Sequence, residues 1–362
     1  MYHPENDPQF AGLAVNRGVE KLPAVNPYFK KTKTRRVYTP AEYVEGILQG
    51  NVTILSQAVT LLESNKSEHQ QLAQQIIEKC LPHAGNSIRI GITGVPGAGK
   101  STSIDAFGMY LIKTHQKKLA VLAIDPSSER SKGSILGDKT RMEELSREPH
   151  AFIRPSPSVG SLGGVARKTR ETIILCEAAG FDTVFVETVG VGQSETAVHS
   201  MVDFFLLIQL AGAGDELQGI KRGIMEMADG IVVNKADGNN IDKAKLAAAQ
   251  YRNALHLFPP SDSGWTPKVL TYSGYHKTGI REVWEMIFDY IAFTRQNGYF
   301  QHKRNSQSKF WMYESINEQL KSRFYNNPVI VKELLEKERQ VLHSEISSFV
   351  AAKLMLDRYF NL

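Results

Sequence analysis

The sequence predicts an α/β fold with a mostly parallel central sheet that is flanked by helices on both faces. From residue 87 onward, strand-like segments alternate with segments of helical periodicity. The strand-like segments 184–186 and 204–207 are continuously apolar, which is typical of parallel strands buried on both faces. In such a fold, a ligand site is expected at the carboxyl ends of the strands.

Helical segments precede this alternating region. Residues 1–39 are polar and rich in Pro and Asn, and we expect an irregular arm there. Thr39-Pro40-Ala41-Glu42 predicts a helix start, because Thr39 can cap the helix and Pro40 suits its first turn. We expect two helices, at about 40–64 with a break near Gly50 and at 67–81.

The alternating region extends from residue 88 to residue 294. Its candidate strands are 88–93, 119–125, 182–188, 203–210, 230–234 and 268–272. Its candidate helices are 99–116, 162–180, 193–201, 217–228, 241–256 and 279–294. No internal repeat interrupts the pattern.

Beyond residue 296 the periodicity is helical only. One mainly apolar stripe contains Phe310, Tyr313, Ile316, Asn317, Leu320 and Phe324. A second helical pattern extends from 329 to 360, with a break at about 344. Such amphipathic helices must bury their apolar faces against the body of the protein or against another subunit.

A phosphate-binding motif joins the first strand to the helix that follows it. Residues 94–101 fit G-x-x-x-x-G-K-[ST], the P-loop. The glycines let successive N–H groups point at phosphate oxygens, Lys100 supplies a positive charge and Ser101 can ligate Mg²⁺. We therefore expect nucleotide contacts from Gly94, Gly97, Ala98, Gly99, Lys100, Ser101 and Thr102.

A second motif selects the base. Asn234-Lys235-Ala236-Asp237 follows the strand 230–233 and fits N-K-x-D, the guanine-reading motif. The Asp237 carboxylate can accept two hydrogen bonds from the guanine edge, whereas adenine would leave this acceptor unpaired. Asn234 is expected to orient the loop, and the stem of Lys235 to cover the base.

Glu187 ends the strand before Gly190, at the position where a carboxylate helps to hold Mg²⁺. The N–H of Gly190 can meet the γ-phosphate. A Ras-like enzyme carries its water-orienting Gln directly after this glycine, but Val191 stands there and Gln193 is displaced. We expect slow hydrolysis, with a group supplied by another switch or by a partner.

Three further charged residues follow the second strand. Asp125 and Asp138 suit Mg²⁺, and Arg141 suits charge on phosphate oxygens. Structural alternatives remain open, because Asp125 also fits a strand-end cap and Arg141 a surface ion pair.

Composition excludes several classes of function. The 362-residue chain is 42% hydrophobic and has a net charge of +5, with no basic run that indicates nucleic-acid binding. Cys80 and Cys176 are the two cysteines, which fits a reducing compartment. No apolar run reaches the roughly 18 residues of a membrane span, and the N-terminus lacks an apolar signal region. We expect a cytoplasmic protein without membrane or nucleic-acid partners.

Taken together, these residues resemble the MeaB/ArgK/MMAA family of P-loop GTPases, which act as chaperones for B12-dependent acyl-CoA mutases. The resemblance covers roughly residues 40–345. Its matching runs, in family order, are GVPGAGKST, LAIDPSS, GSILGDKTRMEELS, FIRPSP, LGGVARKT, VETVGVGQSE, GAGDELQGIKRGIMEMAD and NKAD.

The resemblance implies a P-loop NTPase fold and a role for each site residue. It places Asp125, Asp138 and Glu187 around Mg²⁺ and makes Lys100, Arg141, Glu187 and Gly190 the catalytic set. It also makes 190–195 the second switch and Gly212–Lys221 the third, which transmits the nucleotide state to the mutase. The implied work is GTP-gated loading of adenosylcobalamin into the mutase, with its protection and repair. Methylmalonyl-CoA and isobutyryl-CoA mutases both remain open as partners.

The family also implies a domain organisation. We expect an N-terminal arm and helical extension at 1–85, a GTPase domain at 86–295 and a C-terminal helical dimerisation arm at 296–362. Two positions depart from the family pattern. Its guanine-supporting Ser-Ala reads Ser273-Gly274, which keeps the backbone contact, and Lys132 stands where a glycine is frequent.

Two other functions compete with this prediction. An ATPase or kinase serving arginine/ornithine transport is the family's older description, and Asp237 argues against ATP. A nickel metallochaperone GTPase has a similar architecture but normally carries His/Cys motifs. Cys80 and His83 are neighbours here, and two ligands do not make a metal site.

Overall fold

The structure is a computed structural model that describes residues 38–124, 141–155, 162–188, 194–211 and 222–361. The chain divides into two units, Met1–Tyr38 and Thr39–Leu362. All the helices and strands described below lie in the second unit.

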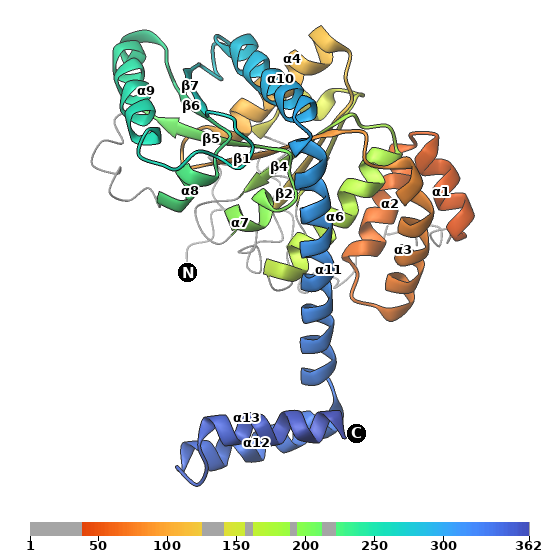
Figure 1. The fold of residues 1–362 in the computed structure, drawn as a ribbon. Helices are drawn as coiled ribbons and strands as arrows, with labels where there is room; N and C mark the ends of the chain where they lie inside the picture. Colours follow the sequence, from red (N-terminus) through yellow and green to blue (C-terminus); the bar gives the residue numbers. More distant parts are fainter. Residues whose placement is uncertain (1–37, 125–140, 156–161, 189–193, 212–221, 362) are drawn as a thin grey trace, which may run out of the picture. The chain divides into compact units, whose positions relative to one another are not determined.

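A seven-stranded sheet forms the centre of the described chain (Figure 1). Its order is β3-β2-β4-β1-β5-β6-β7, and each neighbouring pair is parallel. The strands are β1 (Ile88–Gly94), β2 (Leu119–Ile124), β3 (Ala151–Arg154), β4 (Thr183–Thr188), β5 (Phe204–Leu210), β6 (Gly230–Asn234) and β7 (Lys268–Thr271). The parallel α/β fold predicted from the sequence is confirmed.

Helices cover both faces of this sheet because successive strand residues point to opposite sides. The helices of this region are α4 (Lys100–His115), α6 (Leu162–Ala178), α7 (Ser194–His199), α8 (Arg222–Met227), α9 (Ile241–Leu255) and α10 (Ile280–Gln296), with short 3₁₀ turns at Leu81–His83, Leu145–Arg147 and Gly238–Asn240. In β1, Ile90 and Ile92 join the core beneath α4 and α10. The intervening Gly91 faces the other side, where a Cβ would lie 2.9 Å from a methyl group of Val198.

The helical extension before the sheet has the predicted form. It contains α1 (Pro40–Leu48), α2 (Val52–Glu63) and α3 (Ser67–Cys80), which pack on one another and on α6. Thr39 and Glu42 form a capping box at the start of α1. The predicted break is confirmed at Gly50, which adopts a left-handed φ of 73° between α1 and α2.

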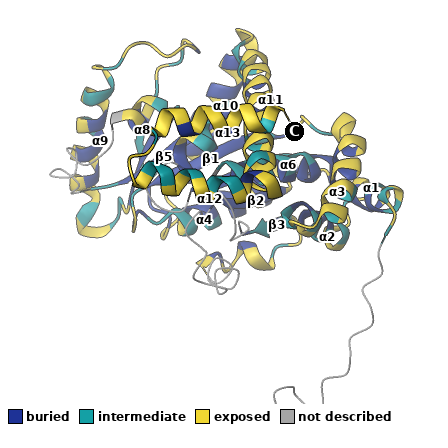
Figure 2. Ribbon diagram, turned by 90° about the horizontal axis from the view of Figure 1, so that it is seen from below, coloured by how far each residue is buried: buried dark blue, intermediate teal, exposed yellow. Residues whose placement is uncertain are grey.

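The C-terminal part consists of α11 (Tyr299–Tyr325), α12 (Pro328–Leu342) and α13 (Ser348–Phe360). The predicted break near 344 is confirmed between α12 and α13, which pack against each other. Figure 2 shows exposed residues along these helices. The predicted apolar stripe stays largely uncovered in the single chain, since Phe310, Tyr313, Ile316 and Leu320 are all exposed.

Strand β3 was absent from the sequence prediction. It has only four residues, lies at the edge of the sheet and ends in a charged Arg154, so it shows neither a long apolar run nor a clear alternation. The first part of the predicted helix 217–228 lies outside the described residues. No helix of the described chain is long and apolar enough to cross a membrane.

Candidate nucleotide-binding site

The loop between β1 and α4 opens at the carboxyl edge of the sheet, as the P-loop motif predicts. Gly99 caps α4 with a left-handed φ of 85°. A Cβ at this position would lie 2.6 Å from Nδ2 of Asn234, so both the conformation and the space require glycine. Gly97 also has a positive φ, of 78°, and has open space around it. Ala98 between them is buried.

Lys100 closes this loop on itself. Its ammonium nitrogen donates to the carbonyl of Gly94 at 2.8 Å. Burial lowers the pKa of Lys100 from its ordinary value, and the carboxylates of Glu187 and Glu195 oppose that effect. The lysine therefore lies between backbone carbonyls and two acids, close to where phosphate oxygens would enter. Thr102, also predicted to contact nucleotide, is exposed on the first turn of α4.

Ser101 and Glu187 come together at the same edge. The Ser101 hydroxyl donates to Oε1 of Glu187 at 3.4 Å. Glu187 is only 6% exposed, so its carboxylate is held within the fold near the end of β4. A hydroxyl and a carboxylate are the hard oxygen ligands that Mg²⁺ prefers, and the pair fits the ion chemically. Within the described ranges, no group of three or more His, Cys, Asp or Glu side chains could hold a metal.

Asn234 joins the phosphate loop to the base-reading loops. Its Nδ2 donates to the carbonyl of Ala98 at 2.7 Å. Its Oδ1 accepts from the backbone N–H of Lys235 at 2.7 Å and of Gly274 at 3.0 Å. Asn234 is 3% exposed, and one side chain thus fixes three segments relative to one another. The role of Asn234 in orienting the base-reading loop stays a prediction.

Asp237 is held in place from the loop after β7. The Ser273 hydroxyl donates to its Oδ2 at 2.5 Å, and the same hydroxyl accepts from the N–H of His276 at 3.1 Å. Lys235 is exposed and adopts a left-handed φ of 60°. The residues predicted to read guanine are therefore brought together.

A buried hydroxyl pair was not anticipated from the sequence. The oxygens of Ser103 and Tyr272 lie 2.5 Å apart. Ser103 donates to the carbonyl of Gly99 at 2.8 Å, so Tyr272 is the donor within the pair. The signal available in the sequence was a tyrosine at the end of the short predicted strand 268–272, which does not by itself indicate a partner.

The remaining predicted site residues are only partly covered by the structure. Asp125, Asp138, Gly190 and the segment Gly212–Lys221 lie outside the described residues. Arg141 is exposed, and the residues after it are anchored to α4. Met142 and Leu145 are buried in the core with α4, and the N–H of Leu145 donates to Asp105 at 2.8 Å.

Comparisons with known proteins agree with this arrangement. The family model "Methylmalonyl Co-A mutase-associated GTPase MeaB" matches residues 55–329. The chain is 49% identical over 289 residues to the GTPase ArgK of Escherichia coli, covering 80% of this chain and 87% of that protein. It is 43% identical over 334 residues to the mitochondrial methylmalonic aciduria type A homolog of Mus musculus, covering 90% of this chain and 79% of that protein.

A solved structure shares the fold. The crystal structure of an LAO/AO transport system kinase matches with a TM-score of 0.71 and 38% identity, covering 89% of this chain and 98% of the other. The family model spans most of the chain, and both relatives exceed 40% identity over most of its length. The chain therefore belongs to the MeaB/ArgK/MMAA family of P-loop GTPases, the methylmalonyl-CoA mutase-associated GTPases.

Proposed function

We propose that this chain binds GTP with Mg²⁺ at the carboxyl edge of its sheet and hydrolyses it slowly to GDP and phosphate. The observation that carries the proposal is the position of Asn234, which ties the phosphate loop to the loops that present Asp237 and Ser273. Because Asp237 offers only acceptor oxygens when ionised, this site favours guanine over adenine.

Each residue at the site has a proposed role. Gly94, Gly97, Ala98, Gly99, Ser101 and Thr102 contribute to the phosphate cradle, and Lys100 exchanges its bond to the Gly94 carbonyl for phosphate oxygens. Ser101 and Glu187, together with Asp125 and Asp138, would hold Mg²⁺, which supplies neutralisation of phosphate charge when bound. Arg141 and Gly190 are proposed to contact the transferred phosphoryl group.

The proposed biological role is that of a chaperone for a B12-dependent acyl-CoA mutase, with methylmalonyl-CoA mutase as the first candidate. Support comes from the family description and from the name of the mouse relative. In this proposal, GTP gates the loading, protection and repair of adenosylcobalamin in the mutase, and Gly212–Lys221 contacts the partner. We propose a cytoplasmic location for this work.

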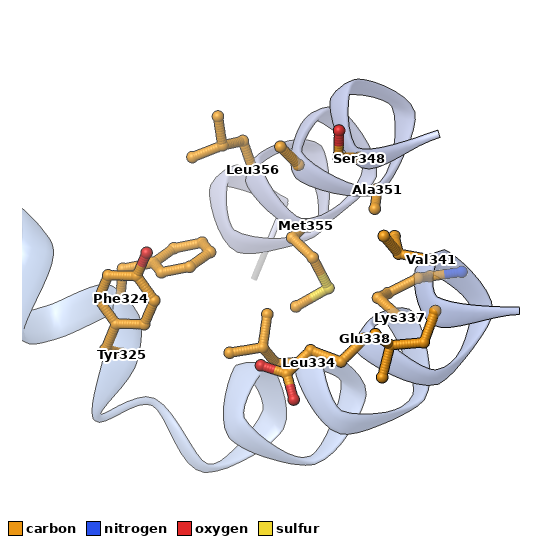
Figure 3. Close-up of a pocket in the computed structure, with 12 residues that line it drawn as sticks. Phe324, Tyr325, Leu334, Lys337, Glu338, Val341, Ser348, Ala351, Met355 and Leu356 are labelled. Carbon is orange, nitrogen blue, oxygen red and sulfur yellow. The ribbon is translucent and has the colours of Figure 1, made fainter. Parts of the chain in front are cut away.

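The C-terminal helices support a homodimer. Figure 3 shows apolar side chains from both helices of the α12–α13 hairpin, among them Leu334, Val341 and Met355, around one cavity. This cavity has a volume of about 550 Å³, and Phe324 and Tyr325 of α11 also line it. Exposed Leu335, Leu342 and Phe349 extend the apolar surface. A second copy of the chain would bury these groups, and 296–362 would then be the dimerisation arm beside the GTPase domain 86–295 and the extension 1–85.

The decisive experiment measures GTP and ATP turnover of the full chain, alone and with methylmalonyl-CoA mutase. We expect slow turnover of GTP only, which rises when the mutase is added. Lys100→Ala should abolish it, whereas Lys113→Ala, an exposed lysine on the same helix, should not. If the rate of GTP turnover does not change when methylmalonyl-CoA mutase is added, the search would turn to another acyl-CoA mutase.

A second candidate function follows from the name of the protein whose solved structure matches, a transport system kinase. It requires ATP as the substrate. Preferential ATP turnover in the same assay would favour it, as would stabilisation of the protein by ADP. We expect GDP to raise the melting temperature. A ligand that binds only the folded state adds about 2.7 kcal/mol to the free energy of unfolding when its concentration is 100 times its Kd.

A further inference from the structure

Helix α7 lies between the nucleotide site and the C-terminal helix α11. It has six residues, so it is about 9 Å long. In its first turn, Ser194 and Glu195 are buried, and the Glu195 carboxylate acts on the charge of Lys100. Its last turn leads into Ser200–Val202, which packs against α11. Because α7 is so short, a displacement of its first turn should also displace its last turn.

Two side chains of α11 bind the last residue of α7 and the segment that joins α7 to β5. Gln307 donates from Nε2 to the carbonyls of Val202 at 2.8 Å and of His199 at 3.4 Å. Trp311 donates from its indole nitrogen to the carbonyl of Ser200 at 3.0 Å. The last carbonyls of a helix have no donors within the helix, and Gln307 supplies one to His199, the last residue of α7. The shorter bonds go to Ser200 and Val202, in the segment between α7 and β5. We call Gln307 and Trp311 the α11 clasp.

The base of α11 is fixed to the sheet just before the clasp. Arg304 forms two hydrogen bonds of 2.7 Å to the Asp203 carboxylate and a third of 2.6 Å to the carbonyl of Ser87. Lys303 donates to the carbonyl of Asp203 at 2.8 Å. Arg304 is 9% and Asp203 only 2% exposed, so this anchor is buried. Movement of α7 relative to the sheet must therefore be taken up at the clasp.

Beyond the clasp, α11 continues without a break to Tyr325 and leads to the hairpin of α12 and α13. Its 27 residues correspond to about 40 Å of helix. Phe324 and Tyr325, at its far end, line the cavity of the hairpin. A single rigid element thus connects the end of α7 to the apolar surface that we assign to the dimer.

We infer that the clasp couples the nucleotide site to the C-terminal helices, with Gln307 and Trp311 acting as positioning residues through α7. The inference rests on the proposed GTP hydrolysis but not on the identity of the mutase.

The test compares the GTP kinetics of Trp311→Phe and Gln307→Met with those of Trp265→Phe in the full chain. Gln307→Met keeps the length of the side chain and loses the donor. Trp311→Phe loses the donor and part of the ring, and the control Trp265→Phe makes the same loss. Trp265 is the matched control, because its indole also donates to a carbonyl at 3.0 Å, that of Asp229, and makes no bond to α7. We expect each clasp variant to change kcat about twofold to tenfold, the equivalent of one hydrogen bond, with KM unchanged. The melting temperature of the control variant should fall by a similar amount, whereas its kcat should equal that of the unchanged protein.

Equal kcat changes in the clasp and control variants would overturn the inference, since the effect would then follow stability alone. A second measurement tests the inference without any substitution in the clasp, in case a clasp variant fails to fold. In a Trp265→Phe/Trp284→Phe chain, Trp311 is the remaining tryptophan, and its emission should differ between GDP and a non-hydrolysable GTP analogue. Identical spectra would also overturn it. Turnover that does not respond to methylmalonyl-CoA mutase would direct the search to another acyl-CoA mutase and would not bear on the clasp.

Discussion

Tyr272 donates a hydrogen bond to Ser103 across 2.5 Å, which joins the end of β7 to the first turn of α4. Ser103 passes this constraint to the phosphate loop through its bond to the Gly99 carbonyl. Nδ2 of Asn234 also approaches the Ser103 oxygen, at 3.5 Å. The two halves of the candidate nucleotide site are therefore joined by buried hydroxyl groups as well as by Asn234.

Tyr272→Phe should lower the stability of the protein by about 1 kcal/mol, because it removes one buried hydrogen bond without changing the packing of the ring. GDP should dissociate several-fold faster, since the two loops lose a common support. Stopped-flow release of a fluorescent GDP analogue measures this rate. Ser103→Ala and the double variant complete a cycle, in which additive effects would show that the pair does not act as a unit.

Asp237→Asn should weaken GDP binding at least about a hundredfold, because the amide places a donor where guanine also presents donors. Affinity for xanthosine diphosphate should rise, since xanthine offers an acceptor at that edge. Calorimetric titration with each nucleotide measures the two dissociation constants and so shows whether the preference has reversed. Asp242→Asn, at an exposed position in the first turn of α9, is the control and should bind GDP normally.

Gly274→Ala adds the methyl group that the family resemblance implies at this position. The added Cβ would lie 3.3 Å from Oγ of Ser103, a tight contact, and the N–H that donates to Asn234 is kept. We expect a stability change of no more than about 1 kcal/mol and an unchanged GDP affinity. A loss of GDP binding above tenfold would mean that this chain uses the glycine itself.

Arg304→Met should destabilise the protein by about 3–5 kcal/mol, because it leaves the buried Asp203 carboxylate without its cation. Urea unfolding, followed by circular dichroism, measures the change. The matched control is Arg281→Ala, which removes an exposed ion pair with Glu285 and should hardly alter the unfolding midpoint. If both variants lost a similar free energy of unfolding, burial of the Arg304–Asp203 pair would not explain its contribution to stability.

Stability should fall as the pH decreases from about 6.5 to about 4. Burial, with help from Lys303, lowers the pKa of His199 from 6.5 to about 4, and Asp229 partly opposes this effect. In this window the unfolded chain binds a proton that the folded chain excludes, so acid favours unfolding by up to about 3 kcal/mol. His199→Gln should flatten the profile between these pH values. His302→Gln, which changes an exposed histidine, should leave the slope as it is.

The sheet and the nucleotide motifs were predictable because each has a strong local signal. Continuous apolar runs such as 204–207 indicate buried strands, and Gly94–Ser101 and Asn234–Asp237 have fixed spacings. Strand β3 gave no such signal because an edge strand of four residues needs few apolar side chains. The bonds of Asn234 to Ala98 and of Tyr272 to Ser103 were not predictable, since they join positions 136 and 169 residues apart. The same holds for the α11 clasp, whose partners are backbone carbonyls and so leave no pattern in the sequence.

The anchoring of Arg304 determines where the chain can be divided. Helical periodicity places the start of the C-terminal part at 296, but α11 stays against the nucleotide-binding body well beyond that point. Trp311 donates to Ser200, and Glu318 lies against Gly163 of α6. A truncation before Tyr299 would remove the cation from Asp203, whereas one after Trp311 would leave the anchor and the clasp intact. In modular terms, the part of α11 from Tyr299 to Ser322 belongs to the nucleotide-binding body. An exchange of C-terminal arms between relatives should therefore be joined after residue 322, beyond the α11 side chains that line a cavity with α3 and α6.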